Sequence, residues 1–346
     1  MTDLVETTRW LIDIVSVTGQ ERAIRDAISE RLVPMVLQPV GDSVVVGEPR
    51  AGAVLLVGHL DTVPLQGEAG TKVVGDRLHG LGATDMKGGL AVMIHLIEAV
   101  GPVDVACVFY AGEEGPLSGN QLGPVLEAAP WLLEASAAVV LEPTDRSVEA
   151  GCQGVINASV AFNGEPAHSA RPWLGDNAIT KAAGFLAAMR RLEPELHVID
   201  GLEFREVMSV TTAQGGVARN VIPARFAMNV NYRFAPDRPP EDAVSHLKAV
   251  CDEADEVVIE DVAPAGTVSV EHPLFRALIE QSGARVLGKQ GWTDVAQLSA
   301  AGIPAINFGP GEPALAHKPG ESVRISDLTW AYDALLAMLG RTGSSR

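Results

Sequence analysis

The strongest constraint on the fold is a change of pattern part-way along the chain. In the first 150 residues, short apolar runs alternate with helix-length segments, and the clearest are strand-like runs at residues 54–58, 103–111 and 137–141 and a helix at 88–100. Strands that alternate with helices in this way predict an α/β layer with a largely parallel sheet.

The pattern changes near residue 155. From there to residue 262 the chain predicts strand, helix, strand, strand, helix and strand, which is an α+β, ferredoxin-like unit of about a hundred residues that can fold alone. The α/β pattern then returns, with helices expected at 273–287 and 326–339 and a buried strand at 303–308. We therefore predict a catalytic domain of residues 1–154 and 263–346, interrupted by an inserted domain of residues 155–262.

Composition excludes several classes of protein. The chain has 346 residues, more than one hydrophobic core usually serves, which agrees with two domains. Its 26 basic and 44 acidic residues give a net charge of −18, which argues against nucleic acid or an anionic membrane surface as a partner. No apolar run is long enough to span a membrane, and the N-terminal segment has the spacing of an amphipathic helix and not of a signal peptide. Three scattered cysteines without a C-x-x-C pair favour the reduced cytoplasm.

Ionisable residues follow several of the predicted strands. The run in "LLVGHLDTVP" ends at a His-x-Asp pair, other strands lead into acidic residues or a late histidine loop, and a glycine-rich turn carries one more acid; these residues are His59, Asp61, Asp85, Glu113, Glu114, Glu142 and His317. Ligand sites in open α/β sheets lie beyond the carboxyl ends of the strands. We therefore expect these side chains to converge on one rim of the sheet.

Such a concentration of carboxylates requires a cation. Like charges about 4 Å apart repel by several kcal/mol at intermediate dielectric, and a divalent metal removes that cost. Two imidazoles and about four carboxylates exceed the four ligands of one zinc ion, whereas two ions that share a carboxylate use them fully. Taken singly, His59 has the alternative of a core or surface histidine, and Asp85 of a helix cap. Their joint placement predicts a dinuclear hydrolase.

Seven stretches, in order along nearly the whole chain, carry a resemblance to a known family. They are "GHLDTVP", "GATDMKGG", "AGEEG", "LEPT", "GEPAHSARP", "RNVIP" and "FGPGEPALAHKPGE". The chain resembles the co-catalytic zinc deacylases, which include aminoacylases, acetylornithine deacetylase and carboxypeptidase G-type enzymes. The resemblance implies a zinc-exopeptidase-like catalytic domain with a mixed, mostly parallel sheet, an inserted lid and dimerisation domain, a homodimer, and two Zn²⁺ ions per chain that Co²⁺ can replace.

The same resemblance implies roles for the rim residues. It assigns two ligands to each ion and one ligand to both: His59 with Glu142, Glu114 with His317, and Asp85 as the bridge. It further implies that Asp61 orients His59 and that Glu113 is the general base.

Three longer stretches indicate the substrate class. "LEPTDRSVEAGCQG", "AHSARPWLGDNAI" and "GWTDVAQLSAAGIPAINFGPGEPALAH" resemble the branch that removes succinate from N-succinyl-LL-2,6-diaminoheptanedioate on the route to diaminopimelate and lysine. A small, anionic N-acyl amino acid is therefore the expected substrate. "LHGLGATD" departs from the family pattern by lacking an arginine between its glycines, and "KPGE" lacks the usual acidic pair. Deacylation of acetylornithine or another acyl amino acid, cleavage of peptides by a dipeptidase or carboxypeptidase, and a catalytically inactive binding protein remain the alternatives.

The inserted domain contributes further candidates. His168, in the polar loop "GEPAHSARP", is a candidate oxyanion donor, and the resemblance suggests that it reaches into the site of a neighbouring copy. Arg171, Arg233 and Asn220 are candidates for holding substrate carboxylates, because guanidinium and amide groups donate hydrogen bonds to them. Thr293 is a candidate for shaping the pocket. Each has the alternative of a surface or structural residue.

Overall fold

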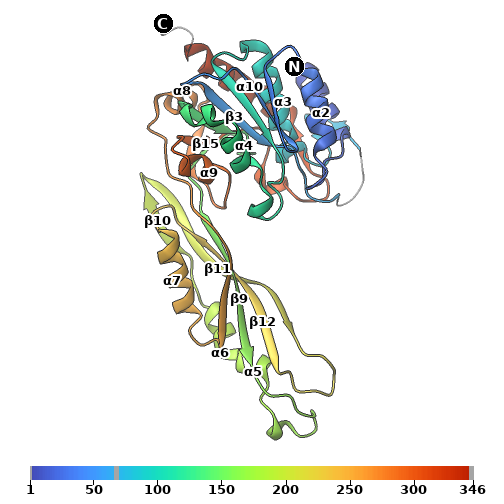
Figure 1. Cartoon of the computed structure of the whole chain (residues 1–346), viewed down its shortest axis with the longest axis vertical. Helices are drawn as coiled ribbons and strands as arrows, with labels where there is room; N and C mark the ends of the chain where they lie inside the picture. The colour runs from blue at the N-terminus through green and yellow to red at the C-terminus, as the bar shows by residue number, and fades with distance from the viewer. Residues whose placement is uncertain (1, 66–69, 343–346) are drawn as a thin grey trace. The chain divides into compact units, whose positions relative to one another are not determined.

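The computed structural model describes residues 2–65 and 70–342 and divides into two compact units (Figure 1). The first unit consists of Met1–Gly151, Thr267–Leu287 and Gln297–Arg346. The second consists of Cys152–Gly266 and Gly288–Ala296.

The first unit is built on an eight-stranded sheet with the order β1-β2-β6-β3-β7-β15-β8-β14. Its strands are β1 (Leu37–Val40), β2 (Ser43–Val46), β3 (Val54–His59), β6 (Val105–Tyr110), β7 (Ala137–Val140), β8 (Ser147–Ala150), β14 (Arg285–Gly288) and β15 (Ala305–Asn307). The four central strands β6, β3, β7 and β15 are parallel to one another, and antiparallel pairs flank them. Every residue of β3, β6 and β7 is buried, as expected for strands covered on both faces. The predicted α/β class with a mixed sheet is confirmed.

Helices and a small second sheet complete this unit. The helices are α1 (Thr2–Asp13), α2 (Arg22–Arg31), α3 (Gly88–Val100), α4 (Leu122–Ala128), α8 (Pro273–Ser282), α9 (Val295–Ala300, which runs into this unit from the second) and α10 (Ile325–Thr342). The small sheet has the order β16-β5-β4, with β4 at Lys72–Val74, β5 at Arg77–His79 and β16 at Ser322–Arg324. The prediction of one helix over 273–287 was wrong at its end, because Gly283 takes a left-handed conformation (φ 64°) that terminates α8.

The second unit is a five-stranded antiparallel sheet with the order β10-β11-β12-β9-β13, and helices α5, α6 and α7 lie along it (Figure 1). Its strands are β9 (Gly154–Asn163), β10 (Glu195–Ile199), β11 (Leu202–Gly215), β12 (Arg225–Phe234) and β13 (Glu256–Ala263), and its helices are α5 (Ala178–Lys181), α6 (Ala183–Met189) and α7 (Pro240–Val250). The inserted antiparallel sheet was predicted, but the short edge strand β10 was not. The expected helix over 176–193 is divided into α5 and α6.

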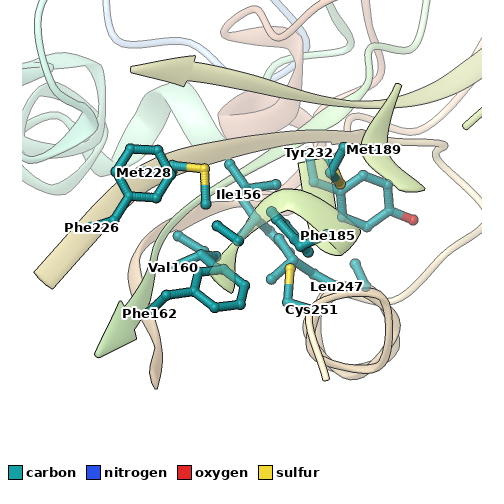
Figure 2. Packing of buried hydrophobic residues seen from close by; sticks show 14 of the residues in the cluster. Ile156, Val160, Phe162, Phe185, Met189, Phe226, Met228, Tyr232, Leu247 and Cys251 are labelled. Carbon is teal, nitrogen blue, oxygen red and sulfur yellow. The ribbon is translucent and has the colours of Figure 1, made fainter. Parts of the chain in front are cut away.

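The core of the second unit lies between the sheet and its helices. Residues of β12 alternate between buried and partly exposed positions, which places one face of the strand against α5–α7. Figure 2 shows aromatic and aliphatic side chains from strands and helices packed together, including Phe162, Phe185, Tyr232 and Leu247. The unit therefore has a hydrophobic core of its own.

Among the described residues, no helix has both the length and the apolar character needed to cross a membrane.

Candidate metal centre

The last residue of β3 begins the candidate site. His59 is buried, and its Nε2 lies 3.1 Å from Asp85 Oδ1 and 3.7 Å from Glu142 Oε1. Its other ring nitrogen, Nδ1, lies 3.0 Å from the backbone oxygen of Asp61. A buried strand therefore delivers one imidazole nitrogen to two carboxylates, while a backbone contact fixes the other nitrogen.

Asp85 contacts both histidines of the site. It lies in the helical turn Ala83–Lys87 that precedes α3, where its own backbone is not helical (φ −128°, ψ 94°). Its Oδ1 faces His59, and its Oδ2 lies 3.3 Å from His317 Nε2. A carboxylate between two imidazoles has the arrangement of a bridging ligand.

His317 lies in the loop after β15, in the left-handed region of backbone conformation (φ 59°). Its Nε2 also lies 2.8 Å from Glu114 Oε1, and Glu114 follows the loop at the end of β6. Glu142 follows β7. The segment after β15 passes so close to it that a Cβ on Gly309 would lie 2.2 Å from Leu141 O. The structure thus brings all five expected ligands together from the ends of β3, β6 and β7 and from two loops.

The Asp61 carboxylate has a different principal contact from the one expected. It lies 3.7 Å from His59 Nδ1, whereas it accepts hydrogen bonds from the backbone N–H groups of Gly112, Glu113 and Glu114 at 3.0, 3.1 and 3.0 Å. The Thr18 hydroxyl donates to it as well, at 3.0 Å. The Asp61 side chain therefore fixes the backbone that carries the expected base and one expected ligand.

The charges of the site favour a cation. Burial lowers the pKa of His59, but the hydrogen bond that it donates to Asp85 and the charges of Glu113 and Glu142 outweigh burial and raise that pKa well above its ordinary value. Hydrogen bonds to Asp85 and Glu114 raise the pKa of His317 to about 10. Every ion pair of Asp85 and Glu114 within the described residues is with a histidine. The carboxylates thus draw protons onto the imidazoles, and these donors suit a divalent metal in place of those protons.

A hollow of about 420 Å³ lies beside His317. Val63, Leu65 and Leu81 give it an apolar wall, and Lys72 and Lys318 give it positive charge. Within the described part of the chain, no salt bridge joins either lysine to a carboxylate.

His168, Arg171 and Asn220 come together at one end of the second unit. Arg171 N donates to His168 O at 2.8 Å, and Ser169 N donates to Asn220 O at 2.9 Å. This loop joins the sheet where Arg225 of β12 pairs with Asn163 at the end of β9. We call the three candidates the distal group, because this end of β9 is the one far from Cys152, where the second unit begins.

Arg233 and Thr293 lie at the opposite end of the same unit. Arg233 of β12 pairs with Val155 at the start of β9, and Cys152, just before β9, donates its thiol to Thr293 O at 3.5 Å. Arg233 lies eight residues after Arg225 along β12, at a distance of roughly 27 Å. We call these two candidates the proximal group, and within this unit the structure does not bring the two groups together.

A second cluster of histidine and acids occurs in the inserted unit. Glu195, His197 and Glu206 place ligand atoms within 4.8 Å of one another. Here, however, Arg238 Nε donates to Glu206 at 2.8 Å and the Tyr232 hydroxyl donates at 2.6 Å. Because a guanidinium already supplies the positive charge, this cluster is a poor metal site.

Sequence reasoning assigned no role to Glu321, which is only 4% exposed and whose carboxylate contacts the turn that carries Asp85. The available signal was its position four residues after His317 in "HKPGE". That spacing alone does not reveal hydrogen bonds to a segment more than 230 residues away.

Comparison with known proteins places this site in a family context. The family model "Peptidase family M20/M25/M40" matches residues 55–341. The chain is 40% identical over 347 residues to the Mycobacterium tuberculosis protein named "Putative succinyl-diaminopimelate desuccinylase DapE", covering 98% of each chain. It is 36% identical over 344 residues to the succinyl-diaminopimelate desuccinylase of Corynebacterium glutamicum, covering 94% of this chain and 93% of the relative. The crystal structure of a Staphylococcus aureus tripeptidase superposes with a TM-score of 0.79 at 21% identity, covering 97% of each chain.

Proposed function

This chain belongs to peptidase family M20/M25/M40 and is a metallohydrolase of that family, and on this premise we propose that it removes succinate from N-succinyl-LL-2,6-diaminoheptanedioate. The convergence of two imidazoles and three carboxylates on one rim is the observation that carries the hydrolytic chemistry. Two relatives of similar length with a desuccinylase name support the choice of substrate.

We propose two zinc ions as the metal, with Co²⁺ able to replace them. His59 and Glu142 would hold one ion, Glu114 and His317 the other, and Asp85 both, in accordance with the contacts each makes. When bound, such a pair lowers the pKa of water towards ~7 and polarises the amide carbonyl.

Glu113 is the proposed proton carrier. Three observations support this choice: its backbone N–H donates to Asp61, its neighbour Glu114 faces His317, and its own charge raises the pKa of His59. The Glu113 carboxylate takes a proton from the attacking water and returns it to the amide nitrogen as the C–N bond breaks. Succinate and the free amine of diaminoheptanedioate are the products.

The hollow beside His317 is the proposed place for the acyl group. The apolar wall suits the two methylene groups of a succinyl chain, and Lys72 or Lys318 can pair with its terminal carboxylate. Specific lysines are needed for this purpose, because the chain as a whole carries a net charge of −18 and repels anions.

The inserted unit is proposed to form the homodimer. The distal group lies at the Arg225 end of β12 and the proximal group at its Arg233 end, and these two residues are roughly 27 Å apart, so one small substrate cannot contact both groups of the same unit. If both groups serve catalysis, they serve different active sites. We therefore propose that His168 donates a hydrogen bond to the oxyanion in the site of the other copy, and that Arg171 and Asn220 hold substrate there. Arg233 and Thr293 are the candidates for the chain's own site.

The proposed location is the cytoplasm, where the substrate of such a biosynthetic reaction would be found. All three cysteines, Cys107, Cys152 and Cys251, are free and buried, in agreement with a reducing compartment.

Parallel assays decide the substrate. Purified protein with zinc should hydrolyse N-succinyl-LL-2,6-diaminoheptanedioate with a kcat/KM at least tenfold above that for N-acetylornithine, another N-acyl amino acid or a dipeptide. Turnover of one of the others without turnover of the succinyl substrate would overturn the proposed substrate and assign the chain to another activity of the family.

A further inference from the structure

We propose that Glu321 is a positioning residue of the metal centre, and that its carboxylate holds the Asp85 turn in the conformation that presents Asp85 to both histidines. The inference rests on the proposed function only in taking Asp85 as the shared metal ligand. It concerns a residue that contacts neither the substrate nor the metal directly.

The position of Asp85 depends on its backbone. The residue lies in an irregular turn, and neither a strand nor a regular helix fixes its φ and ψ. Yet both oxygens of its side chain are used, at 3.1 Å from His59 and 3.3 Å from His317. Because one carboxylate makes both contacts, a shift of the Asp85 backbone alters both of them at once.

Glu321 supplies the missing constraint. Its Oε1 accepts hydrogen bonds from Thr84 N at 3.0 Å and Asp85 N at 3.1 Å, and its Oε2 accepts one from Gly82 N at 3.1 Å. The three donors precede α3 and lack helical partners for these N–H groups. One buried carboxylate therefore fixes three of the four consecutive peptide groups that end at Asp85.

Glu321 is itself fixed by the small sheet. Gly80 N donates to Glu321 O at 3.1 Å, and the next residue, Ser322, pairs with His79 in the β16–β5 ladder. Glu321 N donates to Lys318 O at 3.1 Å, which closes the turn that follows His317. The residue thus connects the segment that carries His317 to the segment that carries Asp85.

The same device occurs a second time in the centre. Asp61 accepts three consecutive backbone N–H groups of Gly112, Glu113 and Glu114, just as Glu321 accepts those of the Asp85 turn. The loops that carry Asp85 and Glu114 are therefore each held by a buried carboxylate from another segment. In both cases the acceptor is a carboxylate, with two oxygens for three backbone donors.

Glutamine at position 321 tests the role with little change in shape. Its single oxygen can serve only one side of the turn, and its NH₂ group would face a backbone N–H donor on the other side. We expect Glu321→Gln to fold and to bind zinc about 10- to 100-fold more weakly, the range for residues that orient metal ligands. Glu321→Asp keeps the charge but shortens the side chain, so a smaller loss is expected.

The matched control is Glu206→Gln in the inserted unit. Glu206 is also a buried carboxylate, 3% exposed, and accepts hydrogen bonds from Tyr232, Arg238 and the backbone of Ala235. Its loss should affect stability without affecting metal. A general effect of deleting a buried negative charge would appear in both variants, whereas positioning affects Glu321 alone.

The experiment is a chelator competition with zinc on the apoprotein of each full-length variant, together with the visible spectrum of the Co²⁺ form. The inference predicts weaker zinc binding and altered cobalt bands for Glu321→Gln, and wild-type values for Glu206→Gln. Wild-type affinity and spectrum for Glu321→Gln would overturn it, and so would equal losses in both variants. Should Glu321→Gln not fold, Glu321→Asp decides by the same criteria.

These measurements use no substrate, so they separate this inference from the proposed function. A wild-type protein that binds two metals but does not hydrolyse the succinyl substrate contradicts the proposed function and leaves the role of Glu321 standing. Normal metal binding by Glu321→Gln contradicts the role of Glu321 and leaves the proposed function standing.

Discussion

The two clusters of histidine and acids in this molecule look alike in residue type and differ in charge balance. In the first unit, His59, Asp85 and Glu114 gather with their ligand atoms within 4.8 Å, and in the second unit Glu195, His197 and Glu206 do the same. Arg238 lies within hydrogen-bond distance of Glu206, whereas the ion pairs of Asp85 and Glu114 among the described residues are all with histidines.

The difference teaches that proximity of ligands is not sufficient to identify a metal site. Buried carboxylates need positive charge, and a protein can supply it from its own side chains or from a bound ion. In the cluster with an arginine, a side chain of the protein itself supplies the positive charge. In the cluster without an arginine, the positive charge must come from protons on the histidines or from a bound metal.

The largest expected effect is the loss of metal from the first cluster. Asp85→Ala removes the carboxylate that contacts both histidines, so we expect the chain to lose its metal and its hydrolysis to fall by more than ~10⁴-fold, beyond the usual loss for a general base. Elemental analysis after gel filtration measures the metal. Glu195→Ala is the control from the second cluster and should keep wild-type metal content; loss of metal in the control would mean that the two clusters do not differ as described.

Removal of the proton carrier is expected to affect the rate and not the metal. Glu113→Gln should lower kcat by about 10²- to 10⁴-fold while about two metals per chain remain, because Glu113 moves a proton and is not needed as a ligand. Steady-state kinetics beside metal analysis provide the check. Unchanged kcat would exclude Glu113 as the base.

Removal of Arg238 tests whether this side chain supplies the positive charge of the second cluster. Arg238→Met leaves Glu206 buried with one donor fewer, so the chain should lose about 1–3 kcal/mol of stability. Calorimetric unfolding measures this loss. Arg205→Met is the control, because the Arg205–Glu203 pair is exposed and worth ~1 kcal/mol or less. Equal effects of the two substitutions would show that Arg238 has no special role.

The smallest expected effect is a pH dependence in the second cluster. Burial of Glu206 opposes its ionisation, but hydrogen bonds from Arg238 and Tyr232 outweigh burial and lower its pKa below the ordinary value of 4.5. The ionised Glu206 therefore stabilises the fold above pH 4.5, and that contribution disappears as the pH falls through the lowered pKa. The stability difference between wild type and Glu206→Gln should be constant from pH 6 to 8 and shrink below about pH 4.5. A difference that grows on acidification has the wrong sign for this account.

Much of the first unit could be predicted from sequence because its elements are defined by local pattern. The continuous apolar runs predicted β3, β6 and β7, and the helical pattern at 88–100 predicted α3, whose observed bounds are Gly88–Val100. The gathering of His59, Glu114 and Glu142 followed from a general rule, since strands that run in parallel end at the same rim.

What could not be predicted depends on contacts between distant segments. The hydrogen bonds of Asp61 to the Glu113 loop and of Glu321 to the Asp85 turn leave no periodic trace in the sequence. Strand β10 is only five residues long and begins at Glu195, shortly after the helix predicted over 176–193, so its pattern was too short to separate. The end of α8 was recoverable, because Gly283 is the residue type that terminates helices in a left-handed conformation.

Anomalous diffraction at the zinc edge, from crystals of the zinc-loaded protein, tests the central claim most directly. The account predicts two peaks per chain about 3.5–4 Å apart, one beside His59 and Glu142, the other beside Glu114 and His317, with Asp85 between them. A single peak, or a peak beside Glu206 in place of these, would contradict it.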